Sequence, residues 1–137
     1  MLRFILPATS ERVRMHTKEK INSRINNYTN ENINYYKNTR NDVISSRIEE
    51  LDHEWDIERV LESNAAVATL ITISLGLHTK DKKWFLFSGV ISAFLLQHAF
   101  LGWCPPLAIF RRMGIRTSTE INEEKLFLKY FRGDFKN

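Results

Sequence analysis

The chain has 137 residues, which is enough for one small domain and too few for two large ones. Its formal net charge is +4. A basic chain can bind nucleic acid, but the sequence holds no nucleic-acid-binding motif, so we expect no nucleic-acid partner. The single cysteine, Cys104, excludes a disulfide within the chain and a zinc site built on several cysteines.

Charge is distributed unevenly along the chain. Residues 1–48 hold nine basic and four acidic residues, an acidic run follows over 49–62, and residues 63–110 carry almost no charge. A stretch of this length without charge is typical of membrane-spanning helices. We therefore predict an all-α protein with three parts: a cytoplasmic helical arm over residues 1–56, a two-span membrane hairpin over 57–110, and a cytoplasmic or interfacial helix over 111–137.

The N-terminal arm is predicted to form two amphipathic helices. The first covers about residues 18–37. In the second, Ile44, Ile48, Leu51 and Trp55 lie on one helical face. We interpret this helix as packing on its neighbour, and a docking surface for a basic partner is the alternative. No Gly or Pro separates it from the next segment, which leaves a direct continuation into the membrane open.

The first predicted span is the charge-free stretch 63–79, completed at the interface by part of 57–61. Ala68, Thr72 and Gly76 recur every four residues along it. Small residues at this spacing allow a second helix to approach closely. We therefore expect these three residues to form a helix-packing face.

The second predicted span, Trp84 to Phe110, runs for 27 residues without Asp, Glu, Lys or Arg. Gly89 and Ala93 offer a face that matches the small residues of the first span. Trp84 and Trp103 stand near its two ends, where amphipathic rings anchor helices at the membrane surface. The sequence therefore predicts a hairpin whose second span is framed by tryptophans.

Basic residues predict the orientation of the hairpin. The loop over 78–83 contains three lysines, whereas the opposite side carries five arginines: Arg47, Arg59, Arg111, Arg112 and Arg116. This bias predicts that both termini lie in the cytoplasm and that the chain crosses the membrane more than once. Arg111 and Arg112 follow the span directly, so we expect them to act as interfacial anchors at anionic lipid headgroups.

The C-terminal segment contains its own start and stop signals. Pro105 and Pro106 remove two backbone hydrogen bonds, so the second span must end or kink there. Thr117 and Glu120 have the spacing of a capping box. A final helix is therefore predicted over about 118–132.

The residues from Gln97 to Pro106 read Gln-His-Ala-Phe-Leu-Gly-Trp-Cys-Pro-Pro, and Arg-Arg-Met-Gly follows at 111–114. This pattern resembles the two-helix domain of the YgaP-type inner-membrane proteins over about residues 60–116. The resemblance implies a small bacterial membrane domain, fused in some members to a rhodanese domain and mostly of unassigned activity. With one cysteine and no rhodanese domain, the chain inherits no sulfurtransferase site, and we expect a stand-alone branch of the family.

Cys104 is the main candidate for chemistry. Arg111 and Arg112 would favour its thiolate form, and the rhodanese association of the family implies sulfur handling. The alternative is a small residue that packs at a helix end, as free cysteines usually do.

Two polar residues of the second span are further candidates. Gln97 precedes Cys104 by seven residues, which predicts one shared face and a hydrogen bond across a helix interface. His98 lies about 100° around the helix and is ionisable at depth, so it is a functional candidate. A cofactor would need a second ligand, and we expect neither a cofactor nor a metal.

The sequence shows no catalytic constellation. It predicts a non-enzymatic membrane scaffold or accessory subunit that contacts the lipid bilayer and assembles as a homo-oligomer or within a larger membrane complex. Two alternatives remain: handling or transport of sulfur species through Cys104, and a soluble helical interaction module whose apolar stretch is a buried interface.

Overall fold

A computed structural model describes residues 5–136, so the outermost parts of both predicted arms, residues 1–4 and 137, lie outside the described residues. The described part is entirely helical, which confirms the all-α prediction. Its seven helices are α1 (Arg12–Met15), α2 (Glu19–Tyr36), α3 (Asn41–His53), α4 (Ile57–Thr79), α5 (Lys83–Leu101), α6 (Pro105–Arg112) and α7 (Ser118–Arg132).

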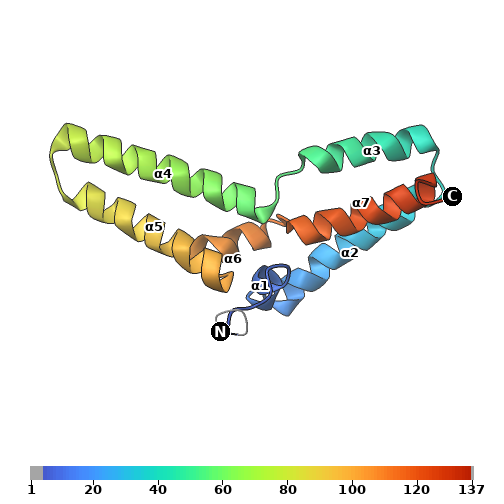
Figure 1. Ribbon diagram of the computed structural model, residues 1–137, viewed down its shortest axis with the longest axis horizontal. Coiled ribbons are helices and arrows are strands. Elements are labelled where there is room, and N and C mark those ends of the chain that lie inside the picture. Colours follow the sequence, from blue (N-terminus) through green and yellow to red (C-terminus); the bar gives the residue numbers. More distant parts are fainter. Residues whose placement is uncertain (1–4, 137) are drawn as a thin grey trace.

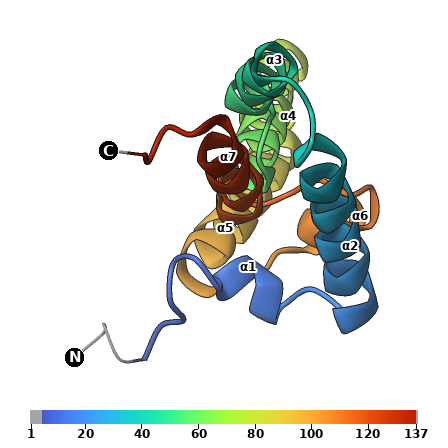
Figure 2. The same ribbon diagram turned by 90° about the vertical axis from the view of Figure 1, so that its right-hand side faces the viewer.

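The helices form two groups that extend in different directions from a common junction. The antiparallel pair α4 and α5 extends to one side, whereas α2, α3 and α7 extend to the other (Figure 1). α7 packs against both α2 and α3, and α6 packs against α4. In the perpendicular view α1 lies in the lower part of the molecule, and α6 lies above it (Figure 2).

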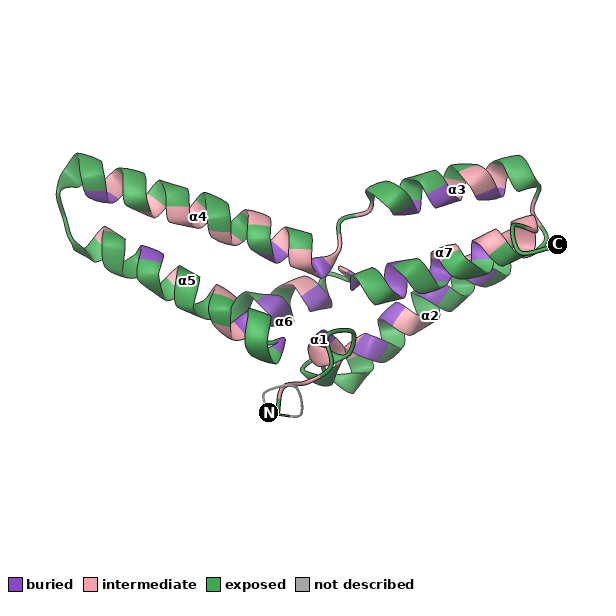
Figure 3. Cartoon of the chain, viewed as in Figure 1, coloured by how far each residue is buried: buried purple, intermediate pink, exposed green. Residues whose placement is uncertain are grey.

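The hairpin leaves most of its apolar surface uncovered. Both helices are long and apolar enough to cross a membrane, yet only 17% and 11% of their most apolar stretches are buried. The core helix of a soluble protein would be mostly buried. Exposed residues cover the outer faces of α4 and α5 (Figure 3), so the helices themselves argue against the soluble alternative.

The contact face between α4 and α5 agrees only in part with the predicted one. Gly76 is buried, and a Cβ atom added there would lie 2.9 Å from the Phe85 ring, so α5 approaches closely at this point. On α5, however, Ser88 is the buried residue, while Gly89 and Ala93 are exposed. The predicted match through Gly89 and Ala93 is therefore wrong within one chain, because the α5 face that meets α4 is rotated away from both.

α3 and α4 are separate helices, so the second arm helix does not continue into the hairpin. α3 ends at His53, and the Asp56 side chain caps α4 by accepting a hydrogen bond from the Arg59 backbone N–H at 2.9 Å. The Ile57 backbone N–H donates to the Arg116 carbonyl at 2.8 Å. The capping aspartate thus supplies the break that Gly or Pro supplies elsewhere.

The charge-free stretch Trp84 to Phe110 contains two helices. Gly102 ends α5 with a left-handed φ of +78°, and its N–H donates to the His98 carbonyl. Pro105 and Pro106 then occupy the first positions of α6, where a missing N–H breaks no hydrogen bond. The span ends as predicted, but glycine ends it and the prolines start the next helix.

α7 begins and ends where the sequence predicts. Thr117 and Glu120 form the capping box, each side chain bonding the other's backbone N–H. Its buried face joins the apolar residues of α3 in one cluster. The residues of that cluster are Ile44, Ile48, Leu51, Ile121 and Leu128.

Gly102 is expected to be the least replaceable glycine at a positive φ. A Cβ there would lie 2.5 Å from the Arg12 backbone, whereas Gly114, at φ +90°, faces open space. Gly114→Ala should lower the free energy of unfolding by about 1–2 kcal/mol through left-handed strain alone. Gly102→Ala should lose at least about 1 kcal/mol more, because the clash adds overpacking. Denaturant unfolding in detergent measures the free energy of unfolding of both variants. Equal losses in the two variants would contradict the close approach of Arg12 to Gly102.

Candidate functional site

The candidate site lies at the junction where α4 begins, α5 ends and α6 begins. A small apolar cluster holds these three helix ends and α1 together. Its buried members are Val13, Ile57, Leu61, Cys104 and Leu107. The cluster fixes the relative positions of residues that lie far apart in the sequence, and Cys104 is part of it.

Cys104 is buried, with 3% of its surface exposed, and it occupies the N-cap position of α6. Because Gly102 ends α5 in a left-handed turn, the helical phase is lost before Cys104. The prediction that Gln97 and Cys104 share a helical face is therefore wrong. Gln97 is half-buried on α5, and among the described residues its side chain makes no hydrogen bond that could join two helices.

His98 belongs to the last turn of α5 and only 2% of its surface is exposed. Its Nε2 lies 2.8 Å from Oε2 of Glu58, in the first turn of α4. Arg12 donates to the other carboxylate oxygen of Glu58 at 3.0 Å. A carboxylate only accepts hydrogen bonds, so Nε2 carries a proton. The imidazole is thereby held in one orientation.

Cys104 and His98 are both buried at this junction, and no hydrogen bond joins their side chains among the described residues. Since Nε2 is engaged with Glu58, the nitrogen left for the sulfur is Nδ1, which has no hydrogen-bond partner among the described residues. Thiol, imidazole and carboxylate thus follow one another in the order used to activate cysteine nucleophiles. The hydrogen bond between a nucleophilic cysteine and its histidine is often long or poorly aligned before a substrate binds.

An apolar cavity of about 310 Å³ opens at Cys104, between α4, α5 and α6. Asn64 is the polar residue of its wall, and its side-chain amide is bonded to the Val60 carbonyl. The apolar wall includes Leu61, Ala68, Ile91, Phe94, Leu95 and Phe110. The cavity volume is at the lower end of the range for small-molecule sites.

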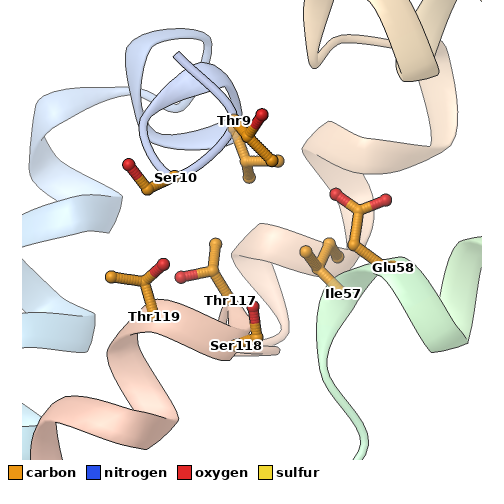
Figure 4. A pocket seen from close by; sticks show the side chains of 8 residues that line it. Thr9, Ser10, Ile57, Glu58, Thr117, Ser118 and Thr119 are labelled. Carbon is orange, nitrogen blue, oxygen red and sulfur yellow. The ribbon is translucent and has the colours of Figure 1, made fainter.

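A second cavity, of about 330 Å³, lies at Glu58 and is lined by hydroxyl groups (Figure 4). Its hydroxyl-bearing residues are Thr9, Ser10, Thr117, Ser118 and Thr119. Glu58 stands at this polar cavity, and Cys104 stands at the apolar one. The series Cys104, His98, Glu58 therefore connects a polar cavity to an apolar cavity.

Arg111 is not the interfacial anchor that the sequence suggests. It is 1% exposed, and its guanidinium donates to both carboxylate oxygens of Glu120, at 2.7 and 2.9 Å. Further donations reach Asn22 at 3.0 Å and Thr17 at 3.2 Å. With its donors turned inward in this way, Arg111 is not available to lipid headgroups or to the Cys104 thiol.

Arg116 makes a second buried junction between the cytoplasmic helices. It donates to Glu54, which follows α3, at 2.6 and 2.8 Å, and to Glu124 of α7 at 2.5 Å. Arg47 of α3 also donates to Glu124, at 3.0 Å. These contacts hold α3 and α7 to the segment that leaves α6.

Burial would raise the pKa of Glu120, but hydrogen bonds from Arg111 and from the Thr117 backbone N–H outweigh it, so its pKa lies below the usual value. Burial would likewise lower the pKa of Arg116, but the hydrogen bonds that it donates to Glu54 and Glu124 raise it. Both groups therefore remain charged at neutral pH inside the protein.

The remaining predicted anchors lie at the surface. Trp84 stands in the first turn of α5 and is half-buried, and Trp103 follows the end of that helix and is exposed. Arg112 is exposed at the end of α6, beside Arg24, which donates to its carbonyl oxygen. The two tryptophans therefore mark the two ends of α5.

Residues 56–120 match the family described as inner membrane protein YgaP-like, transmembrane domain. This segment is a YgaP-like transmembrane domain. It covers α4, α5 and α6 and ends in the first turn of α7, so it includes Cys104, His98 and Glu58. No curated protein and no solved structure matches the chain.

Sequence reasoning missed Glu58 as a partner of His98. An antiparallel hairpin brings the start of its first helix beside the end of its second, so the YgaP-like domain places these two ionisable residues at the same end. The predicted hairpin therefore already indicated that Glu58 and His98 lie close together. Arg12 was not predictable as the second partner of Glu58, because its position depends on how α1 packs.

We expect the stability of the protein to depend on pH through Glu120. A carboxyl group with a depressed pKa stabilises the fold above its unfolded pKa, near 4.5, and loses this contribution as pH falls through its folded pKa. Glu120→Gln should lower the free energy of unfolding by about 3 kcal/mol at neutral pH, because Arg111 is left buried without its partner.

The measurement is thermal unfolding at several pH values between neutral and acidic. The difference in melting temperature between the wild type and Glu120→Gln should become smaller as pH falls below about 4.5. The exposed control Glu123→Gln should have the melting temperature of the wild type at every pH. A gap that stays constant with pH would contradict a charged Glu120.

Proposed function

We propose that the protein is a two-span inner-membrane anchor that carries a rigid helical platform, and that it acts as a scaffold or accessory subunit without an established catalytic role. The observation that supports this best is the pair of buried arginine junctions. Arg111 ties α6 to α7 and α2, and Arg116 ties the same segment to α3 and α7. A platform fixed in this way moves with the hairpin.

Lipid contact follows from the transmembrane family and from the exposed apolar surface. Large apolar side chains point outward along both helices of the hairpin. The most exposed are Leu70, Leu77, Leu86, Phe87 and Leu96. An uncovered surface of this size on a water-soluble protein would cause association, whereas hydrocarbon accommodates it.

In the proposed orientation, α4 and α5 both cross the membrane and both termini are cytoplasmic. The loop Lys80–Lys83 lies on the far side, and the arginine-rich junction lies at the cytoplasmic surface, as the positive-inside rule favours. The platform of α2, α3 and α7 then projects into the cytoplasm, where a partner protein or a second copy would bind it.

Membrane fractionation and cysteine labelling test this topology. Wild-type protein should remain in the membrane after high-salt and carbonate washes. In a Cys104→Ala background, a cysteine introduced as Thr79→Cys should react with an impermeant maleimide from outside spheroplasts, and Ser46→Cys on α3 should react only after lysis. Release by carbonate, or the opposite labelling pattern, would contradict the proposal.

Assembly is expected to use the outer face of α5. Gly89 and Ala93 face away from α4, and an added Cβ at Gly89 meets no atom within 4 Å, so both are free to pack on a second copy. Gly89→Leu should therefore shift the protein to a smaller species in detergent, measured by light scattering after size exclusion. Val90→Leu is the matched control, and unchanged size in Gly89→Leu would count against a homo-oligomer through this face.

Handling of small sulfur species through Cys104 is the second candidate function. The observation that favours it is Cys104 near the buried His98, which is held in turn by Glu58. The wall of the adjoining cavity is mainly apolar, however, which suits an apolar ligand better than an anionic sulfur species.

A further inference from the structure

We infer that Cys104 is an acyl-accepting thiol whose acyl chain occupies the apolar cavity between α4, α5 and α6. The inference rests on the proposed membrane placement, because a chain in this cavity continues naturally into hydrocarbon. It rests on two independent features of the site: an activating series of side chains on one side of the sulfur, and an apolar cavity on the other.

The activating series has the parts that a cysteine nucleophile needs. His98 is buried near Cys104, and the hydrogen bond from Nε2 to Glu58 leaves Nδ1 without a partner among the described residues. A nitrogen lone pair in this position can take the thiol proton. Glu58, held by Arg12, is a positioning residue, since it fixes the orientation of the ring without reaching the sulfur.

The cavity selects the class of ligand. Its wall is built from aliphatic and aromatic side chains, and its polar residue Asn64 already donates to the Val60 carbonyl. A charged ligand would lose its hydration there without gaining partners, whereas an alkyl chain loses nothing. Cys104 stands in the wall, so a chain lying in the cavity can be joined directly to the sulfur.

The reaction is a thioester exchange and needs no oxidant or reductant. The Cys104 thiol gives its proton to Nδ1 of His98, and the sulfur attacks the carbonyl carbon of a long-chain acyl thioester. The bond from that carbon to the donor sulfur breaks, and the departing thiolate takes the proton from Nδ1. The products are an acyl group on Cys104 and a free donor thiol, so atoms, charge and electrons balance.

The polar cavity at Glu58 supports the same assignment. Glu58 lines it together with hydroxyl-bearing residues from the N-terminal segment and from the start of α7 (Figure 4). The site thus has a polar cavity and an apolar cavity, as a donor with a hydrophilic head and an alkyl tail would require.

The experiment uses the full chain purified in mild detergent and an alkyne-tagged palmitoyl thioester of coenzyme A. Wild-type protein should gain one acyl group by intact mass, and hydroxylamine should remove it because the bond is a thioester. Cys104→Ser should gain no hydroxylamine-sensitive label. Absence of acylation on a wild-type protein that fractionates with membranes would overturn the inference and leave the anchor proposal intact.

A matched pair of substitutions tests the cavity. Ala68→Phe fills the cavity, and Ala66→Phe adds the same group at an exposed position of α4 outside the cavity wall. Ala68→Phe should lower the initial rate of acylation at least tenfold, and Ala66→Phe should react like the wild type. A small maleimide should still modify denatured Ala68→Phe completely, which excludes loss of the thiol. Equal acylation rates in the two variants would overturn the role of the cavity.

Substitutions of the activating series test the chemistry. His98→Gln should slow acylation about 100-fold, the lower end of the range for a positioned base. Glu58→Gln should change the pH dependence of the rate, which a purely structural role would not alter. Equal rates in His98→Gln and the wild type would overturn the inference. Rapid reaction with inorganic polysulfide, together with no reaction with the acyl thioester, would overturn it in favour of sulfur handling.

Discussion

The buried pair of Arg111 and Glu120 is the interaction on which the arrangement of the other helices depends. α6 is short, and two features hold it: Leu107 and Phe110 in the apolar cluster, and the charged side chain of Arg111 near its end. A buried ion pair is favourable only when geometry and hydrogen bonding are nearly complete, and Asn22 and Thr17 complete them here. We infer that this demand for partners selects one placement of α6 against α2 and α7.

Fixing one end of α6 also fixes the other. Cys104 is the N-cap of that helix and packs in the apolar cluster with Leu107 of the same helix. The Arg111 pair holds the other end of α6. The ion pair and the apolar cluster together therefore set the position of the helix that carries the thiol.

Features that depend on neighbouring residues were predictable from the sequence, and features that depend on tertiary contacts were not. The capping box at Thr117 defined α7, and the hairpin followed from two apolar stretches and a lysine loop. The prediction that Gln97 and Cys104 share a helical face was wrong because the left-handed turn at Gly102 ends the helix between them. The prediction for Arg111 was wrong for a different reason. Its partners lie in two parts of the chain, residues 17–22 and 115–120, whereas a basic residue after a span normally meets lipid.

The anchor and the thiol site are physically linked through the same cavity. α4, α5 and α6 all contribute to its wall, and α6 carries Arg111 at its other end. An alkyl chain in that cavity would add contacts that exist only in the folded junction, so its binding would stabilise the folded state. Once the chain is attached to Cys104, this stabilisation no longer depends on the concentration of free ligand. Because the arginine junction transmits the position of α6 to α7, occupation of the cavity would hold the platform more firmly against the hairpin. The two proposals are therefore compatible, because acylation of Cys104 would make the platform more rigid.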